Sequence, residues 1–182
     1  KCRSGKSLTM LLIAKYLLEN GHKKILIMTS VPATIDSFKQ DLENFIDFKN
    51  INYKLQKDFN TPDETFNGIV FCSVQYLKMN GKKKKDLLKK MAFDAIFVDE
   101  SHHGSSTDKT KKDILNADIE EISKNIKLTI FASGTADKTK RYYGIHSSCI
   151  YEWEIEDEAY MKQLQNLNIS KEREREIINN MF

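Results

Sequence analysis

The sequence predicts an α/β fold, with a mostly parallel central sheet and helices on both faces. Two observations support this prediction. Short, nearly continuous apolar runs alternate along the chain with longer amphipathic stretches at helical spacing. The apolar runs are rich in β-branched and aromatic residues, which favour strands, and a strand that is apolar throughout must be covered on both sides. The intervening helices would supply that cover.

The chain opens with a predicted helix followed by a predicted strand. Residues 7–20 carry apolar side chains that could pack, and Gly21 is placed to end the helix, because glycine readily adopts the left-handed conformation found just past a helix. The run KILIMT at 24–29 follows and is apolar enough to form a buried strand.

A second helix is predicted over 33–47, because apolar residues recur there at helical spacing. Pro32 suits the first turn of a helix or the residue before it. The side chains expected to pack are Phe38, Leu42, Phe45 and Ile46. A short strand is expected at 53–56.

The middle of the chain continues the same alternation. Strands at 68–73 and 94–100 are expected inside the sheet, with a helix between them at 74–91. A helix near 112–125 then leads to a further strand at 127–132. This order is typical of a parallel sheet, in which a helix connects one strand to the next.

The pattern weakens in the last part of the chain. The remaining predictions are a strand over 149–155, a helix over 156–165 and a charged helix over 170–180. We therefore assign residues 1–150 to one domain and residues 151–182 to a connector.

The composition agrees with one globular domain outside any membrane. The 182 residues are 40% apolar and 30% charged, which is a globular balance, and no apolar run approaches the roughly 18 residues needed to span a bilayer. Cys2, Cys72 and Cys149 form no CxxC pair, so neither a zinc site nor a disulfide framework is indicated. A reducing, cytoplasmic setting is predicted.

The net charge does not identify a partner. The 29 basic and 26 acidic residues leave an excess of +3, which is too small to indicate nucleic acid by itself. The lysine run at 82–85 could contact a phosphate backbone, but Leu87, Leu88 and Met91 form an apolar side beneath it. We interpret the run as the solvated face of a helix.

Gly5, Lys6 and Ser7, directly before the first helix, match the end of a phosphate-binding P-loop. In that pattern, backbone N–H groups and the helix N-terminus bind phosphate oxygens. Lys6 would reach the β- and γ-phosphates of ATP, and the Ser7 hydroxyl would hold a magnesium ion. The first glycine of the pattern would fall one residue before Lys1, so this motif alone indicates little.

A second motif, Asp99-Glu100-Ser101-His102, follows the apolar run at 95–98. Its acids would emerge at the carboxyl end of a buried strand, where open α/β sheets bind ligands. Asp99 would position magnesium through a coordinated water, and Glu100 would orient and deprotonate the attacking water. The alternative is a strand end with solvated acids. It is disfavoured because this motif and the P-loop pattern occur together and in order.

Together the motifs resemble those of the first RecA-like motor domain of superfamily 2 helicases. The nearest group is the DEAD/DEAH group, which includes type III restriction subunits. The resemblance implies a RecA-like P-loop NTPase domain that lacks the strand before its P-loop, and it extends from residue 1 to roughly 165. The matching segments are 3–7 (motif I), 29–32 (motif Ia), 72–77 (motif Ib), 99–102 (motif II) and 133–135 (motif III).

The resemblance also implies roles for individual residues. The ATP phosphates would be bound by Arg3, Ser4, Gly5, Lys6 and Ser7. The phosphate backbone of a nucleic-acid strand would be contacted, through main chain as much as side chain, by the motifs that contain Thr29, Ser30, Ser73 and Gln75.

Motif III and the histidine of motif II would link the nucleotide to that strand. In the family this coupling role belongs to the positions of His102, Ser133 and Thr135. His102 and His103 could instead form a metal-binding pair. No histidine lies four residues away and no cysteine is nearby, so a zinc site is disfavoured. Ser101 stands where alanine is common and Ala136 where proline is usual, and neither change removes a catalytic group.

The implied function is an ATP- and magnesium-dependent helicase or translocase motor that acts on DNA, with RNA the less favoured track. Two alternatives stay open, a double-strand DNA translocase of a restriction system and a truncated motor that only binds nucleic acid. Residues 1–150 would be the helicase ATP-binding domain, and 151–182 would lead to a second RecA-like domain. The family draws its arginine finger from that domain, so the isolated chain is expected to be nearly inactive.

Overall fold

The computed structural model of the chain describes residues 5–58, 61, 63–99, 120–133, 140–141, 143–152, 157, 160, 170, 172–173 and 176, without the side chains of 80–83. The chain divides into two compact units, residues 1–143 and 144–182, and each is described by itself. None of the described helices has the length and apolar character that crossing a bilayer requires.

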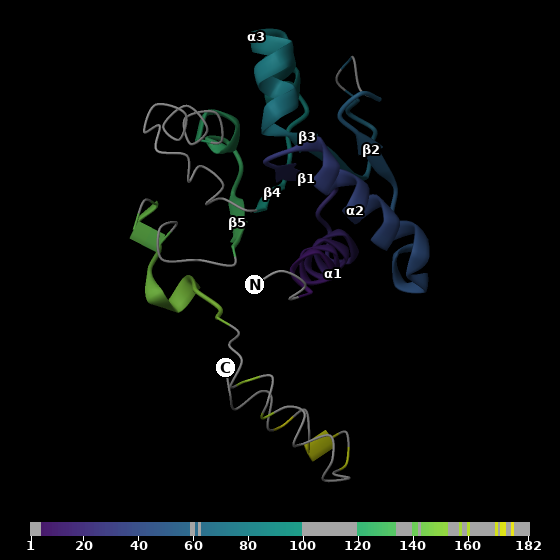
Figure 1. The fold of residues 1–182 in the computed structure, drawn as a ribbon, viewed down its shortest axis with the longest axis vertical. Helices are drawn as coiled ribbons and strands as arrows, with labels where there is room; N and C mark the ends of the chain where they lie inside the picture. The colour runs from purple at the N-terminus through teal and green to yellow at the C-terminus, as the bar shows by residue number, and fades with distance from the viewer. Residues whose placement is uncertain are drawn as a thin grey trace. The chain divides into compact units, whose positions relative to one another are not determined.

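The first unit is built around a sheet of five strands, which are β1 (Lys24–Thr29), β2 (Tyr53–Leu55), β3 (Gly68–Ser73), β4 (Ala95–Asp99) and β5 (Leu128–Ala132). The strands lie in the order β2-β3-β1-β4-β5, and every neighbouring pair is parallel (Figure 1). All the carboxyl ends therefore lie along one edge of the sheet. The α/β fold with a parallel sheet, predicted from the sequence, is confirmed.

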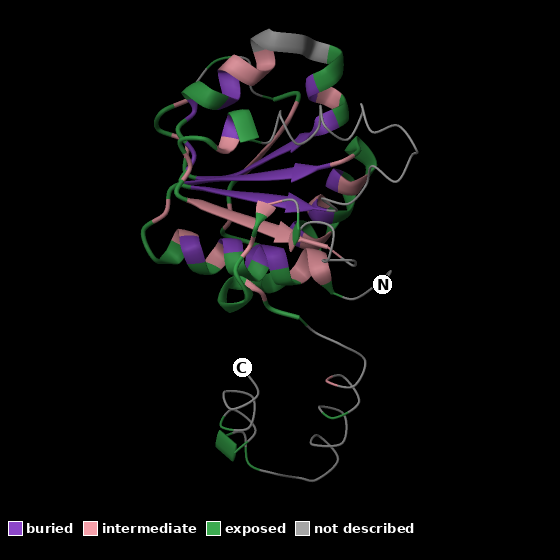
Figure 2. Cartoon of the chain, turned by 90° about the vertical axis from the view of Figure 1, so that its left-hand side faces the viewer, coloured by how far each residue is buried: buried purple, intermediate pink, exposed green. Residues whose placement is uncertain are grey.

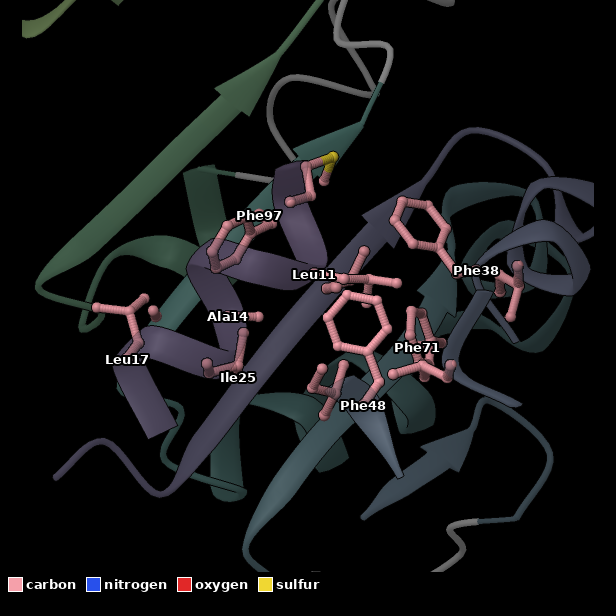
Figure 3. Close-up of a cluster of buried hydrophobic side chains, with 14 residues drawn as sticks. Leu11, Ala14, Leu17, Ile25, Phe38, Phe48, Phe71 and Phe97 are labelled. Atoms are coloured by element: carbon pink, nitrogen blue, oxygen red, sulfur yellow. The ribbon is translucent and has the colours of Figure 1, made fainter. Parts of the chain in front are cut away.

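Helices cover both faces of this sheet. They are α1 (Lys6–Glu19), α2 (Pro32–Asn44) and α3 (Val74–Lys90), with a 3-10 turn η1 at Ile46–Phe48. The side chains of β1 alternate between two apolar clusters, because successive residues of a strand point to opposite faces. Ile25 and Ile27 belong to the cluster that contains residues of α1 and α2 (Figure 3). Leu26 and Met28 belong to the cluster that contains residues of α3.

The burial of the strands follows their place in the sheet (Figure 2). Every residue of β1, β3 and β4 is buried, whereas β5 at the edge is partly exposed along its whole length. The lysine-rich helix α3 packs through Leu87 and Leu88, which are 8% and 0% exposed, and Met91 just past its end is 1% exposed. The apolar side predicted beneath the lysine run is thus confirmed.

The end of α1 forms as predicted, with Gly21 just past the helix at a φ of 96°. The N–H of Gly21 donates to the carbonyl oxygen of Leu18 at 3.5 Å, and the N–H of His22 donates to that of Leu17 at 3.0 Å. These two bonds form a Schellman motif, which satisfies carbonyl groups that the helix end would leave unpaired.

The prediction for the end of the second helix was wrong. The helix stops at Asn44, and Phe45 adopts an extended conformation before the chain turns into η1. Phe38 and Leu42 are buried as expected, but Phe45 is 43% and Ile46 is 75% exposed. The 3-10 turn instead directs Phe48 into the core, where it is 3% exposed. Phe45 and Ile46 continue the helical spacing of apolar residues, so the spacing alone does not show where the helix ends.

The strand predicted over 149–155 was also wrong over its described residues. Cys149 ends a 3-10 turn η2 at Ser147–Cys149, and residues 150–152 lie in no strand. The N–H of Ser148 donates to Nδ1 of His146 at 3.2 Å, and the N–H of Ile150 donates to the carbonyl oxygen of Ser147 at 3.1 Å. These local bonds turn the backbone and replace the partners that a strand would need.

Candidate nucleotide-binding site

The start of α1 has the backbone geometry of a phosphate-binding loop end. Gly5 precedes the helix with a φ of 71°, in the left-handed region that favours glycine. A Cβ atom there would meet nothing within 4 Å, so the conformation and not the available space requires glycine. The carbonyl oxygen of Gly5 accepts the N–H of Thr9 at 2.9 Å, which closes the first turn of the helix.

This helix start is well suited to an anion. No side chain among the described residues caps it, and its first turn contains no acidic residue. The first N–H groups of a helix have no partner within the helix, and the helix dipole places partial positive charge there. Lys6, the first residue of α1, adds a full positive charge at the same point. An oxyanion such as a phosphate would satisfy both.

Lys6 lies beside the acid that ends β4. Its Nζ is 3.1 Å from Oδ1 of Asp99, and the two side chains are 21% and 3% exposed. A buried carboxylate is costly unless a positive charge compensates it, and the ammonium group of Lys6 supplies that charge. The structure thus brings together two residues that the sequence placed in separate motifs, 93 positions apart (99 − 6).

The residues at this point fit magnesium and a nucleoside triphosphate. Magnesium prefers oxygen ligands and is usually held by one or two carboxylates together with substrate phosphates. Asp99 offers such a carboxylate, and Ser7 offers a hydroxyl in the first turn of α1. The lysine and the exposed helix N-terminus offer donors for the phosphates.

The residues predicted to contact nucleic acid lie together at the same edge of the sheet. Thr29 and Ser73 are register partners at the carboxyl ends of β1 and β3. Ser30 directly follows Thr29 and Gln75 lies two residues after Ser73, and the N–H of Gln75 donates to the carbonyl oxygen of Ser30 at 3.3 Å. Gln75 is exposed and Ser30 is partly exposed.

The hydroxyls of Thr29 and Ser73 are used inside the protein. The two residues are 1% and 0% exposed. Thr29 Oγ1 donates to the carbonyl oxygen of Val31 at 3.0 Å. Ser73 Oγ accepts the N–H of Tyr76 at 3.1 Å and so caps the start of α3. These two hydroxyls are therefore not available to a ligand, and Thr29 and Ser73 could contribute to nucleic-acid binding only by holding the adjoining loops in place.

The remaining predicted site residues divide into two groups. Ser133 is described and partly buried, and it follows Ala132, the register partner of Asp99. Ser133, the first residue of motif III, therefore comes directly after the residue paired with Asp99, the first residue of motif II. Outside the described residues lie Arg3, Ser4, Glu100, His102 and Thr135.

Sequence reasoning missed Gln56, which follows β2 at this edge. Its Oε1 accepts hydrogen bonds from the N–H of Ser73 at 2.8 Å and from Oγ of Ser73 at 2.9 Å. The available signal was a polar residue at the carboxyl end of a predicted strand. Nothing in the sequence indicated that β2 lies next to β3, so its partner could not be named.

The fold and this site together define a RecA-like α/β domain. A parallel sheet is covered on both faces, and a lysine after a left-handed glycine faces the acid at the end of a buried strand. The chain belongs to the family described as type III restriction enzyme, res subunit, whose model matches residues 2–136. The resemblance to a superfamily 2 motor domain, drawn from the sequence motifs, is confirmed.

Two individual proteins show the same likeness. The chain is 29% identical over 143 residues to a Mycoplasma pneumoniae protein named "Putative type II restriction enzyme and methyltransferase RM.MpnORF110P C-terminus". That match covers 69% of this chain and 18% of the relative. The crystal structure of the UvsW helicase from bacteriophage T4 has a similar fold, with a TM-score of 0.53 and 20% identity. It covers 78% of this chain, which spans 48% of the helicase.

Proposed function

We propose that this chain is the ATP-binding half of a DNA motor, which hydrolyses ATP with magnesium in order to move along or unwind DNA. The observation that carries the proposal is the approach of Lys6 to Asp99, which joins the helix start to the strand end at the ligand-binding edge of the sheet. Membership of the restriction-subunit family supports the same function.

Each residue of the site has a part in this proposal. Lys6 and the N-terminus of α1 bind the β- and γ-phosphates, with Arg3, Ser4 and Gly5 completing the loop. Ser7 and Asp99 would hold magnesium, which would compensate the negative charge of the phosphates during transfer of the terminal phosphoryl group to water. Glu100 orients the attacking water and accepts its proton.

Binding of ATP would change the partner of Lys6. In the present structure its ammonium group lies against the Asp99 carboxylate. A triphosphate offers more negative charge at the helix N-terminus, and magnesium would compensate the carboxylate in place of the ammonium. The same lysine would then serve the phosphates, and the metal would compensate the buried carboxylate.

The nucleic-acid strand would lie across the neighbouring strand ends. Ser30 and Gln75 are the exposed members of that surface, and Thr29 and Ser73 hold its loops. The contacts available are hydroxyls, amides and main chain, which bind phosphates without reading bases. DNA is favoured over RNA because the curated relative is named as a restriction enzyme and methyltransferase. His102, Ser133 and Thr135 would couple this surface to the nucleotide.

A second candidate is a translocase that moves along duplex DNA without separating it, as a subunit of a restriction system. The name of the Mycoplasma pneumoniae relative favours this variant. The two functions differ in one observable: a helicase releases a labelled strand from a duplex, whereas a translocase displaces a bound obstacle and leaves the duplex paired. A third possibility, a truncated motor that only binds nucleic acid, would neither release the strand nor displace the obstacle, and it would not hydrolyse ATP.

The test is a steady-state ATPase assay on the complete protein that contains this chain, with and without DNA. We expect DNA to stimulate hydrolysis, and Lys6→Ala to lower it by about 100-fold or more, since charge neutralisation is central to phosphoryl transfer. Lys15→Ala is the matched control. Lys15 is on the same helix, and its Nζ lies 3.9 Å from carboxylate oxygens of Glu19 and Asp47, which belong to no proposed site. Hydrolysis by the Lys6→Ala protein at the wild-type rate would refute the proposed site.

A further inference from the structure

Gln56 links three segments at the carboxyl edge of the sheet. It follows β2, and its single acceptor oxygen takes both the N–H and the Oγ–H of Ser73. Ser73 in turn caps α3 through the N–H of Tyr76. The first turn of α3 is also tied to the loop after β1, by the hydrogen bond from Gln75 to Ser30. The side chain of Gln56 therefore helps to fix the surface on which Ser30 and Gln75 are exposed.

The orientation of the Gln56 amide follows from its partners. A backbone N–H can only donate, so the atom 2.8 Å from the N–H of Ser73 must be the carbonyl oxygen. The oxygen has two lone pairs, and the two bonds from Ser73 occupy both. The amide nitrogen is left with two N–H donors, which no hydrogen bond among the described residues engages, and the residue is partly exposed.

We propose that Gln56 is a nucleic-acid-binding residue, whose amide nitrogen donates to a phosphate oxygen of a strand crossing the ends of β2, β3 and β1. This inference rests on the nucleic-acid binding proposed above. It extends the binding surface by one strand beyond the predicted motifs, to the edge strand β2. A phosphate is the ligand because the group offered is a pair of donors beside further exposed amide and hydroxyl groups.

Two substitutions of Gln56 distinguish a contact with a phosphate from a purely structural role in holding the start of α3. Gln56→Glu keeps an oxygen that can accept both bonds from Ser73, but it replaces the outward donors with a negative oxygen. Gln56→Lys loses the acceptor and places a positive charge at the same point. A residue that only supports α3 would tolerate glutamate and suffer from lysine. A residue that faces a phosphate would show the opposite order of affinities.

The measurement is the binding of the complete protein to fluorescent oligothymidylate, and to a duplex of mixed sequence, over a series of salt concentrations. We expect Gln56→Glu to weaken binding by roughly tenfold with an unchanged Tm. Gln56→Lys should bind at least as tightly as wild type, and the slope of log K against log salt should steepen by about one. Gln40→Glu and Gln40→Lys, at an exposed position far along α2, are the matched controls.

The outcomes are distinguishable. Wild-type affinity of Gln56→Glu, or equal weakening by glutamate and lysine, would overturn the role of Gln56 while leaving nucleic-acid binding intact. Failure of the wild-type protein to bind either probe would overturn the proposed function itself. If Gln56→Glu lowers the Tm, the lysine variant still decides the matter, because an unchanged salt slope in that protein would contradict a phosphate contact.

Discussion

At the carboxyl edge of the sheet Asp99 faces the ammonium group of a lysine, whereas at the amino edge Asp94 faces backbone amides. Oδ2 of Asp94 accepts the N–H of Lys23 at 2.6 Å and the N–H of Lys24 at 3.0 Å, which ties the start of β1 to the residue before β4. The N–H of Asp94 donates back to the carbonyl oxygen of Lys24 at 2.9 Å.

The difference lies in whether the partner can leave. A backbone amide at a strand start cannot move away unless the strand itself separates, so the bonds of Asp94 serve the fold. The lysine facing Asp99 is on a flexible side chain, and its ammonium group can turn to another anion without disturbing the sheet. The comparison shows that the acid at the carboxyl edge has a partner that can be exchanged, whereas the acid at the amino edge is bound to main chain.

The largest effect should come from the carboxyl edge. Glu100→Gln in the complete protein should keep ATP binding and lower hydrolysis by about 100-fold or more, because the attacking water loses its base. The measurement is steady-state turnover beside equilibrium binding of a fluorescent nucleotide. Asp94→Asn is the control from the other edge, and its turnover per folded molecule should equal that of wild type. Wild-type turnover in the Glu100→Gln protein would show that Glu100 is not the general base.

Gly68 should show the largest effect on stability at the amino edge. Its φ is 146°, and a Cβ atom there would lie 2.1 Å from the carbonyl oxygen of Asn52, so the neighbouring backbone must shift. We expect Gly68→Ala to lower the free energy of unfolding by on the order of 3 kcal/mol, measured by urea denaturation.

Gly21→Ala is the control for strain alone. Gly21 has a φ of 96°, but an added Cβ atom would meet nothing within 4 Å. Gly21→Ala should therefore lower the free energy of unfolding by only about 1 kcal/mol. Equal losses at Gly21 and Gly68 would show that close packing against Asn52 contributes nothing.

Asp94 gives a pH-dependent effect of intermediate size. Burial raises the pKa of its carboxyl group. The hydrogen bonds from the amides of Lys24 and Lys23, together with the nearby charges of His22 and Lys23, lower the pKa by more than burial raises it. The net pKa therefore lies below 3.8. The stabilisation is complete above the unfolded pKa and is lost as the pH falls through the lower folded pKa.

We expect Asp94→Ala to lower the free energy of unfolding by about 1 kcal/mol at neutral pH, because Asp94 is exposed and water weakens the hydrogen bonds of its charge. The difference from wild type should shrink as the pH falls below 3.8. Asp36→Ala, exposed on α2, is the control. A difference that stayed constant with pH would show that the charge of Asp94 does not matter.

The smallest effect is expected at Ala92, between α3 and β4. Its φ is 50°, a left-handed conformation that alanine adopts at a cost, and the residue is exposed. Ala92→Gly should therefore raise the free energy of unfolding by up to about 1 kcal/mol, with turnover unchanged. The measurement is again urea denaturation, and a loss of stability would show that the side chain packs favourably where it is.

The strands were the most predictable part of the molecule. The runs at 24–29 and 68–73 were predicted with the bounds that the structure shows, because a strand buried on both faces is apolar throughout and polar residues mark its ends. Helix starts at Pro32 and after Gly5 were predictable for local reasons as well. Sequence patterns report local geometry and burial, and these elements depend on little else.

What escaped prediction depends on neighbours that are distant in the chain. The pairing of β2 with β3 gives Gln56 its partner, and no spacing rule brings these residues together. At the candidate site, the sequence assigned Lys6 and Asp99 to one ATP and magnesium site, whereas the burial of the Thr29 and Ser73 hydroxyls was not predicted. The sequence does not show whether the hydroxyl group of a serine or threonine points to solvent or to a carbonyl group of the protein.

The order of the sheet has a consequence for how the protein emerges from the ribosome. β1 lies at the centre, yet both of its neighbours, β3 and β4, are synthesised after it. At about 5–20 residues per second, the 44 residues between the end of β1 and the end of β3 (73 − 29) take some seconds to appear. During that interval an apolar strand has no partner on either side. Among the described strands, β1 is therefore the one that waits longest for a partner, and its apolar side chains are exposed to aggregation during translation.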